Sequence, residues 1–164
     1  MLLFLDFDGV LHPDAVYLRR GRAELRAEGE LFMWAHYLQA IVEDDDVRIV
    51  LSTSWARHLG YQRARKALPE PVSRLVVGAT WHSAMRKAGS DHRTLWDLQT
   101  RYEQIQAYLG RLRAPVEWLA VDDDDFGWPE EKRSHLIHTD SNLGLSCADV
   151  REQLRERLAP RGCG

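Results

Sequence analysis

The chain has few cysteines and no long apolar run, and both absences exclude classes of protein. Its 164 residues contain two cysteines, Cys147 and Cys163, which are too few for a disulfide framework. No apolar run approaches the ~20 residues that a membrane-spanning helix needs. The first apolar run carries Asp6 and Asp8, unlike the cleavable segment of a secretory signal. We therefore expect a cytoplasmic protein with no membrane partner, and the sequence gives no indication of its oligomeric state.

Lysine is also scarce, whereas arginine is abundant. Of the 22 basic residues, 19 are arginine and three are lysine. The planar arginine side chain suits phosphate and stacks on bases, but a high-GC genome would enrich arginine as well. Two nucleotide-binding glycine loops, Gly-x-x-x-x-Gly-Lys and Gly-x-Gly-x-x-Gly, are absent, and the histidines lack the His-x-x-x-His spacing of a zinc-binding helix. The sequence therefore argues against nucleotide binding through either loop and against a helical zinc site.

The composition is that of an ordinary globular domain, with 45% hydrophobic and 29% charged residues. We expect one domain over residues 1–160 and a flexible tail over 161–164. Strand-like runs alternate with amphipathic helices, which is typical of a parallel sheet covered on both faces. The five expected strands are 2–6, 47–52, 74–79, 116–121 and 135–139.

Apolar residues at helical spacing predict three helices between and after these strands. The apolar faces consist of Leu31, Trp34, Leu38 and Ile41 in the first, Tyr102, Ile105, Leu109 and Leu112 in the second, and Val150, Leu154 and Leu158 in the third. Ser146 and Asp149 have the spacing of a capping box for the third helix. Residues 12–30 and 80–99 are too irregular to assign, which is typical of functional or mobile loops.

The most informative motif lies where the first expected strand ends. An apolar run from Leu3 to Leu5 is followed by Asp6, Phe7, Asp8 and Gly9. The two carboxylates therefore fall at the carboxyl end of a strand, which is the edge where open α/β sheets bind ligands. The glycine allows the backbone to turn sharply and approach a ligand closely. Because paired carboxylates repel each other unless a cation offsets them, we interpret Asp6 and Asp8 as a functional site.

Hydroxyl-bearing residues follow the second expected strand. Ser52, Thr53 and Ser54 come directly after its apolar residues. Hydroxyls and free backbone N–H groups at a strand-to-helix turn can bind an anion. Ser52 and Thr53 are therefore candidate phosphate-binding residues, although a helix cap is the commoner role of such a cluster.

The third signal is Arg101, a cation in an unfavourable position of a predicted helix. Thr100 and Glu103 have the spacing of a capping box, which places Arg101 in the first turn of a helix. A cation is unfavourable beside the positive end of the helix dipole. The position of Arg101 therefore indicates a nearby anion, with a solvated arginine as the alternative.

Four consecutive aspartates, 122–125, follow the fourth expected strand. Adjacent carboxylates repel one another unless some are screened or bound to a metal, and Mg²⁺ is held by one or two carboxylates together with substrate oxygens. Neighbouring residues at a strand end point in opposite directions. We therefore expect one of Asp122 and Asp123 to bind a metal, and Asp124 and Asp125 to belong to a solvated turn.

In this order the motifs resemble those of the haloacid-dehalogenase-like (HAD) phosphohydrolases. The run Asp6-Phe7-Asp8-Gly9-Val10-Leu11 is similar to their first motif. Ser52 matches the hydroxyl of the second motif, and Asp122 and Asp123 match the acidic pair of the fourth. The third motif is usually a lysine, and here Arg101 takes its place, with Lys87 as the rival candidate. The resemblance covers most of the chain, from Leu2 to about Leu158.

Three longer runs resemble one small branch of that family. They are Phe-Leu-Asp-Phe-Asp-Gly-Val-Leu-His-Pro, Leu-Ser-Thr-Ser-Trp and Asp-Asp-Asp-x-x-Gly-Trp-Pro. The branch is capless, and its domains also occur in multidomain RNA-repair proteins. The resemblance implies a Rossmann-like three-layer α/β/α sandwich with a central, mostly parallel five-stranded sheet and no large cap.

The resemblance also implies a Mg²⁺-dependent phosphomonoesterase. Asp6 would be the nucleophile and form an aspartyl-phosphate, while Asp8 would act first as general acid and then as general base. The metal would be held by Asp6, by the backbone carbonyl of Asp8, and by Asp122 or Asp123. Ser52, Thr53 and Arg101 would bind the phosphate, and Arg101 would also balance charge during the transfer.

The substrate is the least defined expectation. An open site admits a large phosphorylated substrate, and the arginines and tryptophans of residues 55–101 favour a nucleic-acid end or a nucleotide. The alternative is a non-catalytic HAD-like binding or accessory domain, because Arg101 replaces the usual lysine. A receiver-like phosphoacceptor domain fits less well, since such domains carry the phosphorylated aspartate on a middle strand and normally need a late lysine.

Overall fold

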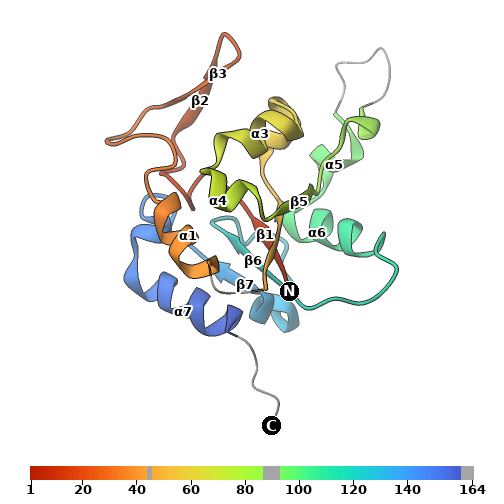
Figure 1. Cartoon of the computed structure of the whole chain (residues 1–164). Coiled ribbons are helices and arrows are strands. Elements are labelled where there is room, and N and C mark those ends of the chain that lie inside the picture. The colour runs from red at the N-terminus through yellow and green to blue at the C-terminus, as the bar shows by residue number, and fades with distance from the viewer. Residues whose placement is uncertain (44–45, 87–92, 160–164) are drawn as a thin grey trace.

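A five-stranded sheet forms the centre of the computed structural model, which describes residues 1–43, 46–86 and 93–159. Its strand order is β5-β4-β1-β6-β7, and every neighbouring pair is parallel (Figure 1). All five expected strands are confirmed. Their bounds are β1 Leu2–Leu5, β4 Arg48–Leu51, β5 Val76–Ala79, β6 Trp118–Asp122 and β7 Leu136–His138.

Helices cover both faces of this sheet, as the α/β/α prediction requires. The α-helices are α1 Ala35–Val42, α2 Ser54–His58, α3 Tyr61–Ala67, α4 Glu70–Ser73, α5 Leu95–Leu98, α6 Arg101–Leu109 and α7 Ala148–Leu158. Three short 3₁₀ helices are η1 Ser83–Met85, η2 Glu130–His135 and η3 Gly144–Ser146.

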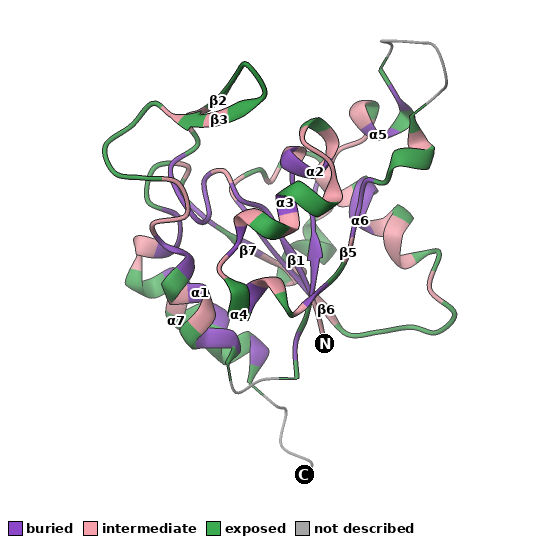
Figure 2. Cartoon of the chain, turned by 45° about the horizontal axis from the view of Figure 1, so that its top comes forward, coloured by how far each residue is buried: buried purple, intermediate pink, exposed green. Residues whose placement is uncertain are grey.

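The side chains of β1 alternate between the two halves of the core. Leu3 and Leu5 pack into the larger cluster, which includes residues of α1 and α7. Phe4 faces the other way, into a smaller cluster with Ile105 of α6 and Trp128. This period-two alternation follows from strand geometry. Figure 2 shows the result, with buried strands between helices whose outer faces are exposed.

A β-hairpin stands apart from the central sheet. Strands β2 (Val16–Arg19) and β3 (Arg22–Leu25) pair antiparallel, and they project from the body of the domain with mostly exposed side chains (Figure 2). The hairpin lies within residues 12–30, which the sequence pattern left unassigned. Its two-residue turn has positive φ at both Arg20 (50°) and Gly21 (74°), the backbone of a tight hairpin turn. A glycine suits that turn, but arginine gives no such signal.

Two helices are shorter than their apolar patterns predict. Phe32 has a φ of 61°, which interrupts a right-handed helix, so Leu31 and Trp34 precede α1 instead of belonging to it. Helix α6 ends at Leu109, and Leu112 lies beyond it. Spacing alone could not find the start of α1, because Leu31 and Trp34 pack against the core from the turn before it.

The capping box predicted for α7 is wrong. The helix begins at Ala148, with Cys147 as a cap residue whose side chain makes no capping bond, so Ser146 does not pair with Asp149. Instead Ser146 belongs to η3, where its hydroxyl donates to the backbone carbonyl of Leu143. The Ser146 hydroxyl thus forms a hydrogen bond within this turn and does not cap the helix.

Some expectations fall on residues that the structure does not describe. Lys87, Cys163 and the expected tail over 161–164 lie outside the described residues. Among the described helices, none combines the length and the apolar character that crossing a membrane requires. The cytoplasmic setting stays a prediction.

Candidate active site

The register of the sheet brings three polar residues side by side. In the central strand, Leu5 is paired with Leu51 on one side and with Val121 on the other. The next residue along each strand is Asp6, Ser52 and Asp122, respectively. Backbone hydrogen bonds continue the pairing, since Asp6 N–H donates to Val121 at 3.2 Å and Ser52 N–H to Leu5 at 2.8 Å. The apolar runs therefore place these three polar residues side by side at one edge of the sheet.

Asp6 and Asp122 share one buried cation. The side chain of Arg101 lies with Nε 2.9 Å from Oδ2 of Asp122 and with Nη2 3.5 Å from Oδ2 of Asp6. The Nε contact is an ion pair without the alignment of a hydrogen bond. Both aspartates are almost completely buried, at 4% and 1% exposed. The anion predicted near Arg101 is thus this pair of carboxylates.

Local structure explains how Arg101 reaches them. The capping box predicted for α6 is confirmed, with Glu103 N–H donating to the Thr100 hydroxyl at 3.2 Å and Thr100 N–H to the Glu103 carboxylate at 2.7 Å. Arg101 is the first residue of that helix, and its Nη1 donates to Oε1 of Gln104 at 3.1 Å. The cap fixes the start of the helix, and Gln104 holds the guanidinium.

Asp123 joins the same cluster. Ligand oxygens of Asp6, Asp122 and Asp123 lie within 4.8 Å of one another. Strand β6 ends at Asp122, so the alternation that would separate neighbouring side chains no longer applies. The expectation that one of the two aspartates faces the site is therefore replaced by an arrangement in which both do. Gly9, with a φ of 71°, makes room, because a Cβ there would lie 2.3 Å from the Asp123 carboxylate.

The electrostatics of this cluster favour a bound cation. Burial raises the pKa of Asp6 well above its ordinary value, and Asp122 raises it further while Arg101 opposes the change. Burial likewise raises the pKa of Asp122 to about 6 and raises the pKa of Asp123. For Arg101, burial disfavours the charge, but the aspartates outweigh it and its pKa is raised. Among the described residues, the three carboxylates and the guanidinium of Arg101 form an oxygen-rich, negatively charged donor set that fits a hard divalent cation.

Asp8 is held by two ring donors beside this cluster. Nε1 of Trp55 lies 3.2 Å from each carboxylate oxygen, and Nε2 of His12 lies 2.9 Å from Oδ1. The other ring nitrogen of His12 accepts the backbone N–H of Phe32 at 3.1 Å. The imidazole hydrogen is therefore assigned to Nε2, which donates to Asp8. His12 is fully buried, whereas Asp8 is partly exposed and available to a ligand.

The hydroxyls after β4 divide between two roles. Ser52 is 1% exposed, and its Oγ has no hydrogen-bond partner among the described residues. A buried hydroxyl without a partner is costly, so a ligand oxygen is a natural partner for it. Thr53 differs, because its hydroxyl accepts the N–H of Trp55 at 3.3 Å and caps α2. The helix-cap alternative thus holds for the side chain of Thr53.

Comparison with known proteins supplies the family. A family model described as "HAD domain in Swiss Army Knife RNA repair proteins" matches residues 2–150. The chain belongs to this family. Comparisons with curated proteins and with solved structures find no match. The strand order, the flanking helices and the acidic motifs are those of a HAD-type hydrolase fold.

Most of the predicted site residues meet in this HAD domain. The carboxyl edge of the sheet brings together Asp6, Asp8, Ser52, Arg101, Asp122 and Asp123. Asp125 instead forms an exposed ion pair with Arg133 at 2.7 Å, as expected of a solvated turn. Between the rival basic residues, Arg101 is the one placed at the carboxylates, while Lys87 lies outside the described residues.

Several supporting contacts of the HAD domain were not predicted. The donor roles of His12 and Trp55 toward Asp8 are two of them, and the Thr139 hydroxyl bond to the carbonyl of Gly9, at 2.7 Å, is a third. Their partners lie far away in sequence or across a turn, so no spacing pattern encodes them. Trp55, Trp81 and Trp96 are 6%, 3% and 7% exposed, which makes them anchors rather than exposed stacking platforms.

Proposed function

We propose that this HAD domain is a Mg²⁺-dependent phosphomonoesterase that acts through an aspartyl-phosphate at Asp6. The observation that carries the proposal is the setting of the Asp6 carboxylate. Its Oδ1 accepts the Phe7 N–H at 2.8 Å, its Oδ2 faces Arg101, and two more carboxylates lie in the same cluster. One oxygen is thus fixed, and the group belongs to a charged cluster suited to a metal and a phosphate.

Metal binding is assigned to Asp6, Asp122 and Asp123, with the backbone carbonyl of Asp8 as a further ligand. The bound cation would supply positive charge, which lets a phosphate dianion approach a carboxylate nucleophile. Arg101 supplies part of that charge from the protein itself.

The reaction then needs two proton movements, both of which we assign to Asp8. An oxygen of Asp6 attacks phosphorus, the bond to the ester oxygen breaks, and Asp8 donates a proton to the departing alcohol. A water molecule then attacks the phosphoryl group, and Asp8 takes the proton from it. This breaks the bond to Asp6 and releases inorganic phosphate. Trp55 and His12 orient Asp8 for both steps.

The hydroxyl of Ser52 and the guanidinium of Arg101 are assigned to the transferring phosphoryl group. Donors aimed at oxygens that gain charge in the transition state lower the barrier. Because the Thr53 hydroxyl caps α2, any contact from Thr53 is left to its backbone N–H.

The proposed substrates are phosphorylated ends of nucleic acids or nucleotides. The family description names RNA-repair proteins, which supports this choice. The insertion between β1 and α1 is a two-stranded hairpin, so a long substrate can reach the carboxyl edge of the sheet. Because Asp8 beside the cluster is partly exposed, small phosphate esters are also expected to react.

The decisive experiment measures phosphate release from an aryl phosphate, with Mg²⁺ and with a chelator, for the wild type and for Asp6→Asn. Asp125→Asn makes the same chemical change in an exposed aspartate outside the cluster and serves as the matched control. We expect turnover that needs Mg²⁺, is lost in Asp6→Asn and is retained in Asp125→Asn. No turnover by the wild type, or full activity of Asp6→Asn, would favour the non-catalytic binding domain instead.

A further inference from the structure

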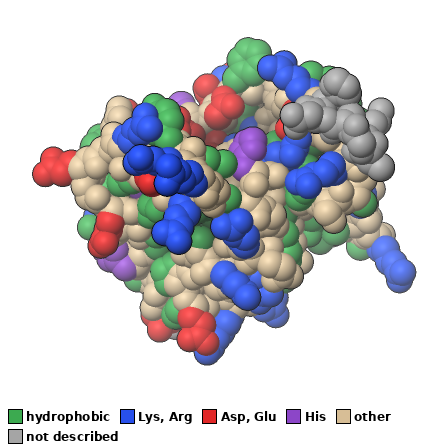
Figure 3. All heavy atoms as spheres, turned by 90° about the horizontal axis from the view of Figure 1, so that it is seen from above, with side chains coloured by type: hydrophobic (Ala, Val, Ile, Leu, Met, Phe, Trp, Pro, Cys, Tyr) green, Lys and Arg blue, Asp and Glu red, His purple; other side chains and the backbone are tan. Residues whose placement is uncertain are grey.

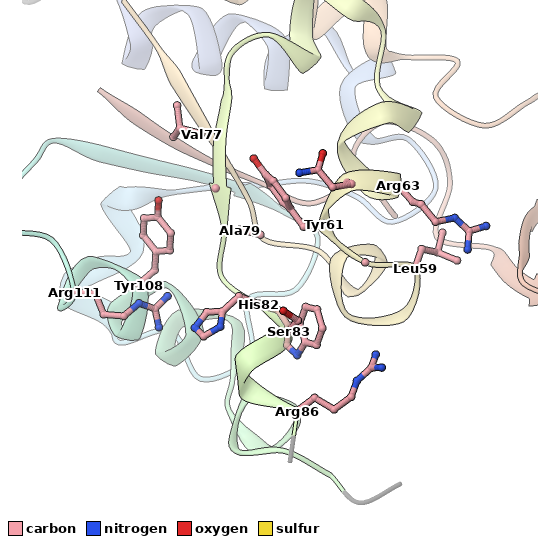
Figure 4. A pocket seen from close by; sticks show the side chains of 14 residues that line it. Leu59, Tyr61, Arg63, Val77, Ala79, His82, Ser83, Arg86, Tyr108 and Arg111 are labelled. Atoms are coloured by element: carbon pink, nitrogen blue, oxygen red, sulfur yellow. The ribbon is translucent and has the colours of Figure 1, made fainter. Parts of the chain in front are cut away.

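A second hollow lies beside the free edge of the central sheet. Strand β5 is the edge strand, and next to it a groove of about 760 Å³ is bounded by the start of α3, by η1 and by the end of α6 (Figure 4). Six of its side chains carry the argument. We call this feature the edge groove, and the six are Tyr61, Arg63, Trp81, Arg86, Tyr108 and Arg111.

The charge of the edge groove is opposite to that of the carboxylate cluster. Arg63, Arg86 and Arg111 line it, and none of its described lining residues is acidic. Arg63 and Arg86 lie on one side and Arg111 on the other (Figure 4). On the face seen in Figure 3, basic side chains are widely spread and acidic ones lie mainly toward the margins. Within the described part of the chain, these three arginines form no ion pair with a carboxylate, and such arginines in a groove are suited to a polyanion.

Aromatic rings lie beside two of these arginines. The guanidinium carbon of Arg111 lies 5.5 Å from the ring centroid of Tyr108, and that of Arg86 lies 5.8 Å from the Trp81 ring. Tyr61 and Tyr108 are only partly buried, so their rings are open to a ligand. Trp81 is 3% exposed, and its Nε1 has no partner among the described residues, so the groove wall holds a buried donor without an acceptor.

Two smaller hollows share lining residues with the edge groove and with the active site. One of about 310 Å³ is lined by Asp8, Ser54 and Leu59, and Leu59 also lines the edge groove. Another of about 300 Å³ contains Arg101 and shares Ser54 with the first. The hairpin borders this path as well, since Arg63 Nη2 donates to the carbonyl of Gly21 at its turn, at 3.1 Å. Leu59 thus borders both the hollow at Asp8 and the edge groove, which places the edge groove next to the active site.

We propose that the edge groove binds the single-stranded part of a nucleic acid whose phosphorylated end lies at Asp6. This proposal rests on the proposed function for the assignment of the phosphorylated end. Single strands are held by basic grooves that follow the backbone and by aromatic rings on which bases stack. The edge groove combines both features, since three arginines and two partly buried tyrosine rings line it. A peptide that offers only carboxylates would not use the rings.

Binding is tested with Asp6→Asn protein, which retains the groove and cannot turn over its ligand. The probe is a fluorescent single-stranded RNA of about 10 nucleotides, measured by anisotropy over a range of salt concentrations. The double variant Arg86→Gln/Arg111→Gln is expected to bind about tenfold or more weakly and to reduce the salt slope by about 1. The control Arg48→Gln/Arg155→Gln removes the same charge from two exposed arginines, one at the other end of β4 and one on α7, and should bind normally.

Two competitors test whether the rings take part. An abasic oligonucleotide of the same length has the phosphates without the bases, and an oligoglutamate peptide has negative charge alone. Intact RNA should compete far better than either. Equal competition by the abasic strand or by the peptide would overturn the proposal of a nucleic-acid groove. The proposal would also fail if Arg48→Gln/Arg155→Gln weakened RNA binding as much as Arg86→Gln/Arg111→Gln does. This comparison uses unmodified groove residues, so it remains decisive if the double variant folds poorly.

Kinetics separate this proposal from the function of the active site. With Asp6 intact, Arg86→Gln/Arg111→Gln should raise KM for a phosphorylated oligonucleotide and leave both its kcat and aryl phosphate turnover unchanged. Suppose that the protein hydrolyses the aryl phosphate and that Arg86→Gln/Arg111→Gln binds RNA as tightly as the unmodified groove. This result would refute the proposed edge groove and would still support the proposed phosphatase. RNA binding that depends on the groove, without any turnover of either ester, would support the groove and refute the phosphatase.

Discussion

The indole N–H of Trp55 faces the carboxylate of Asp8, with Nε1 3.2 Å from each of its two oxygens. The ring is locked in place, since it is 6% exposed and packs against Phe7 with ring centroids 5.6 Å apart. A donor equidistant from both oxygens limits rotation of the carboxylate. Trp55 therefore holds the Asp8 carboxylate in one orientation, although the two residues follow different strands.

Replacing Trp55 with Phe removes this donor while keeping an aromatic ring in the core. We expect kcat to fall about tenfold, because Asp8 is less well placed to protonate the leaving group. The loss should be larger for alkyl phosphates than for aryl phosphates, since a phenolate leaves without much help from an acid. Steady-state kinetics on a series of esters measures this dependence.

The matched control for that series is Trp96→Phe. Trp96 is equally buried, but its Nε1 donates to Thr80, at 3.3 Å, and does not contact Asp8. An equal loss in both variants, or a loss in Trp55→Phe that does not depend on the leaving group, would contradict a positioning role for Trp55.

Arg101 is expected to be essential for stability when no metal is bound. Arg101→Gln leaves Asp6 and Asp122 buried without their counter-charge, which should lower the free energy of unfolding by about 3 kcal/mol. Added Mg²⁺ should recover part of the loss. Arg101→Lys keeps a cation and should retain more of the stability and measurable turnover. Urea unfolding with and without Mg²⁺ gives these values, and a loss in Arg101→Gln that Mg²⁺ does not reduce would argue against a shared cation site.

Mg²⁺ should stabilise the wild type by binding the folded state alone. At a concentration about 100 times its Kd, the expected gain is about 2.7 kcal/mol, seen as a rise in Tm. Asp123→Asn should shrink the Mg²⁺-induced rise because it removes one carboxylate of the cluster. Asp125→Asn, which changes an exposed aspartate two positions away, should leave the rise unchanged. Equal shifts in both variants would place the metal elsewhere.

The strands and the acidic edge were predictable because they depend on local patterns. Apolar runs followed by Asp6, Ser52 and Asp122 define strand ends, and parallel pairing then brings those ends together without further information. The unfavourable helix position of Arg101 was the signal that an anion lay nearby, and the ion pairs at 2.9 and 3.5 Å account for it. In both cases a local rule and the global fold agree.

The hairpin and the orientation of Asp8 were not predictable for physical reasons. Arg20 adopts a positive φ in the turn between β2 and β3, and an arginine does not signal such a conformation. The contacts of Asp8 with His12 and Trp55 depend on how a turn and a helix pack, and single residue types do not encode that. The edge groove likewise requires residues from four separate elements, α3, β5, η1 and α6.

Asp97 provides a prediction of how stability depends on pH. Its Oδ2 accepts the Thr94 N–H at 2.6 Å and the Thr94 hydroxyl at 2.8 Å, while its Oδ1 accepts from Nε of Arg57 at 3.1 Å. Burial alone would raise the pKa of Asp97, but these hydrogen bonds outweigh it and lower the pKa below the ordinary value of 3.8. A carboxylate whose pKa is lower in the folded state stabilises the protein above its unfolded pKa. That contribution is lost as the pH falls from 3.8 through the folded pKa.

Asp97→Asn should therefore lower the free energy of unfolding by about 2 kcal/mol near neutral pH, because the substitution removes both the charged cap and the ion pair with Arg57. The difference from the wild type should shrink steadily once the pH falls below 3.8. Urea unfolding at a series of pH values measures it. Glu156→Gln, an exposed substitution on α7, should change stability by less than about 0.5 kcal/mol at every pH. A difference for Asp97→Asn that stays constant into acid would mean that the ionised carboxylate contributes nothing, and that the side chain acts through its shape alone.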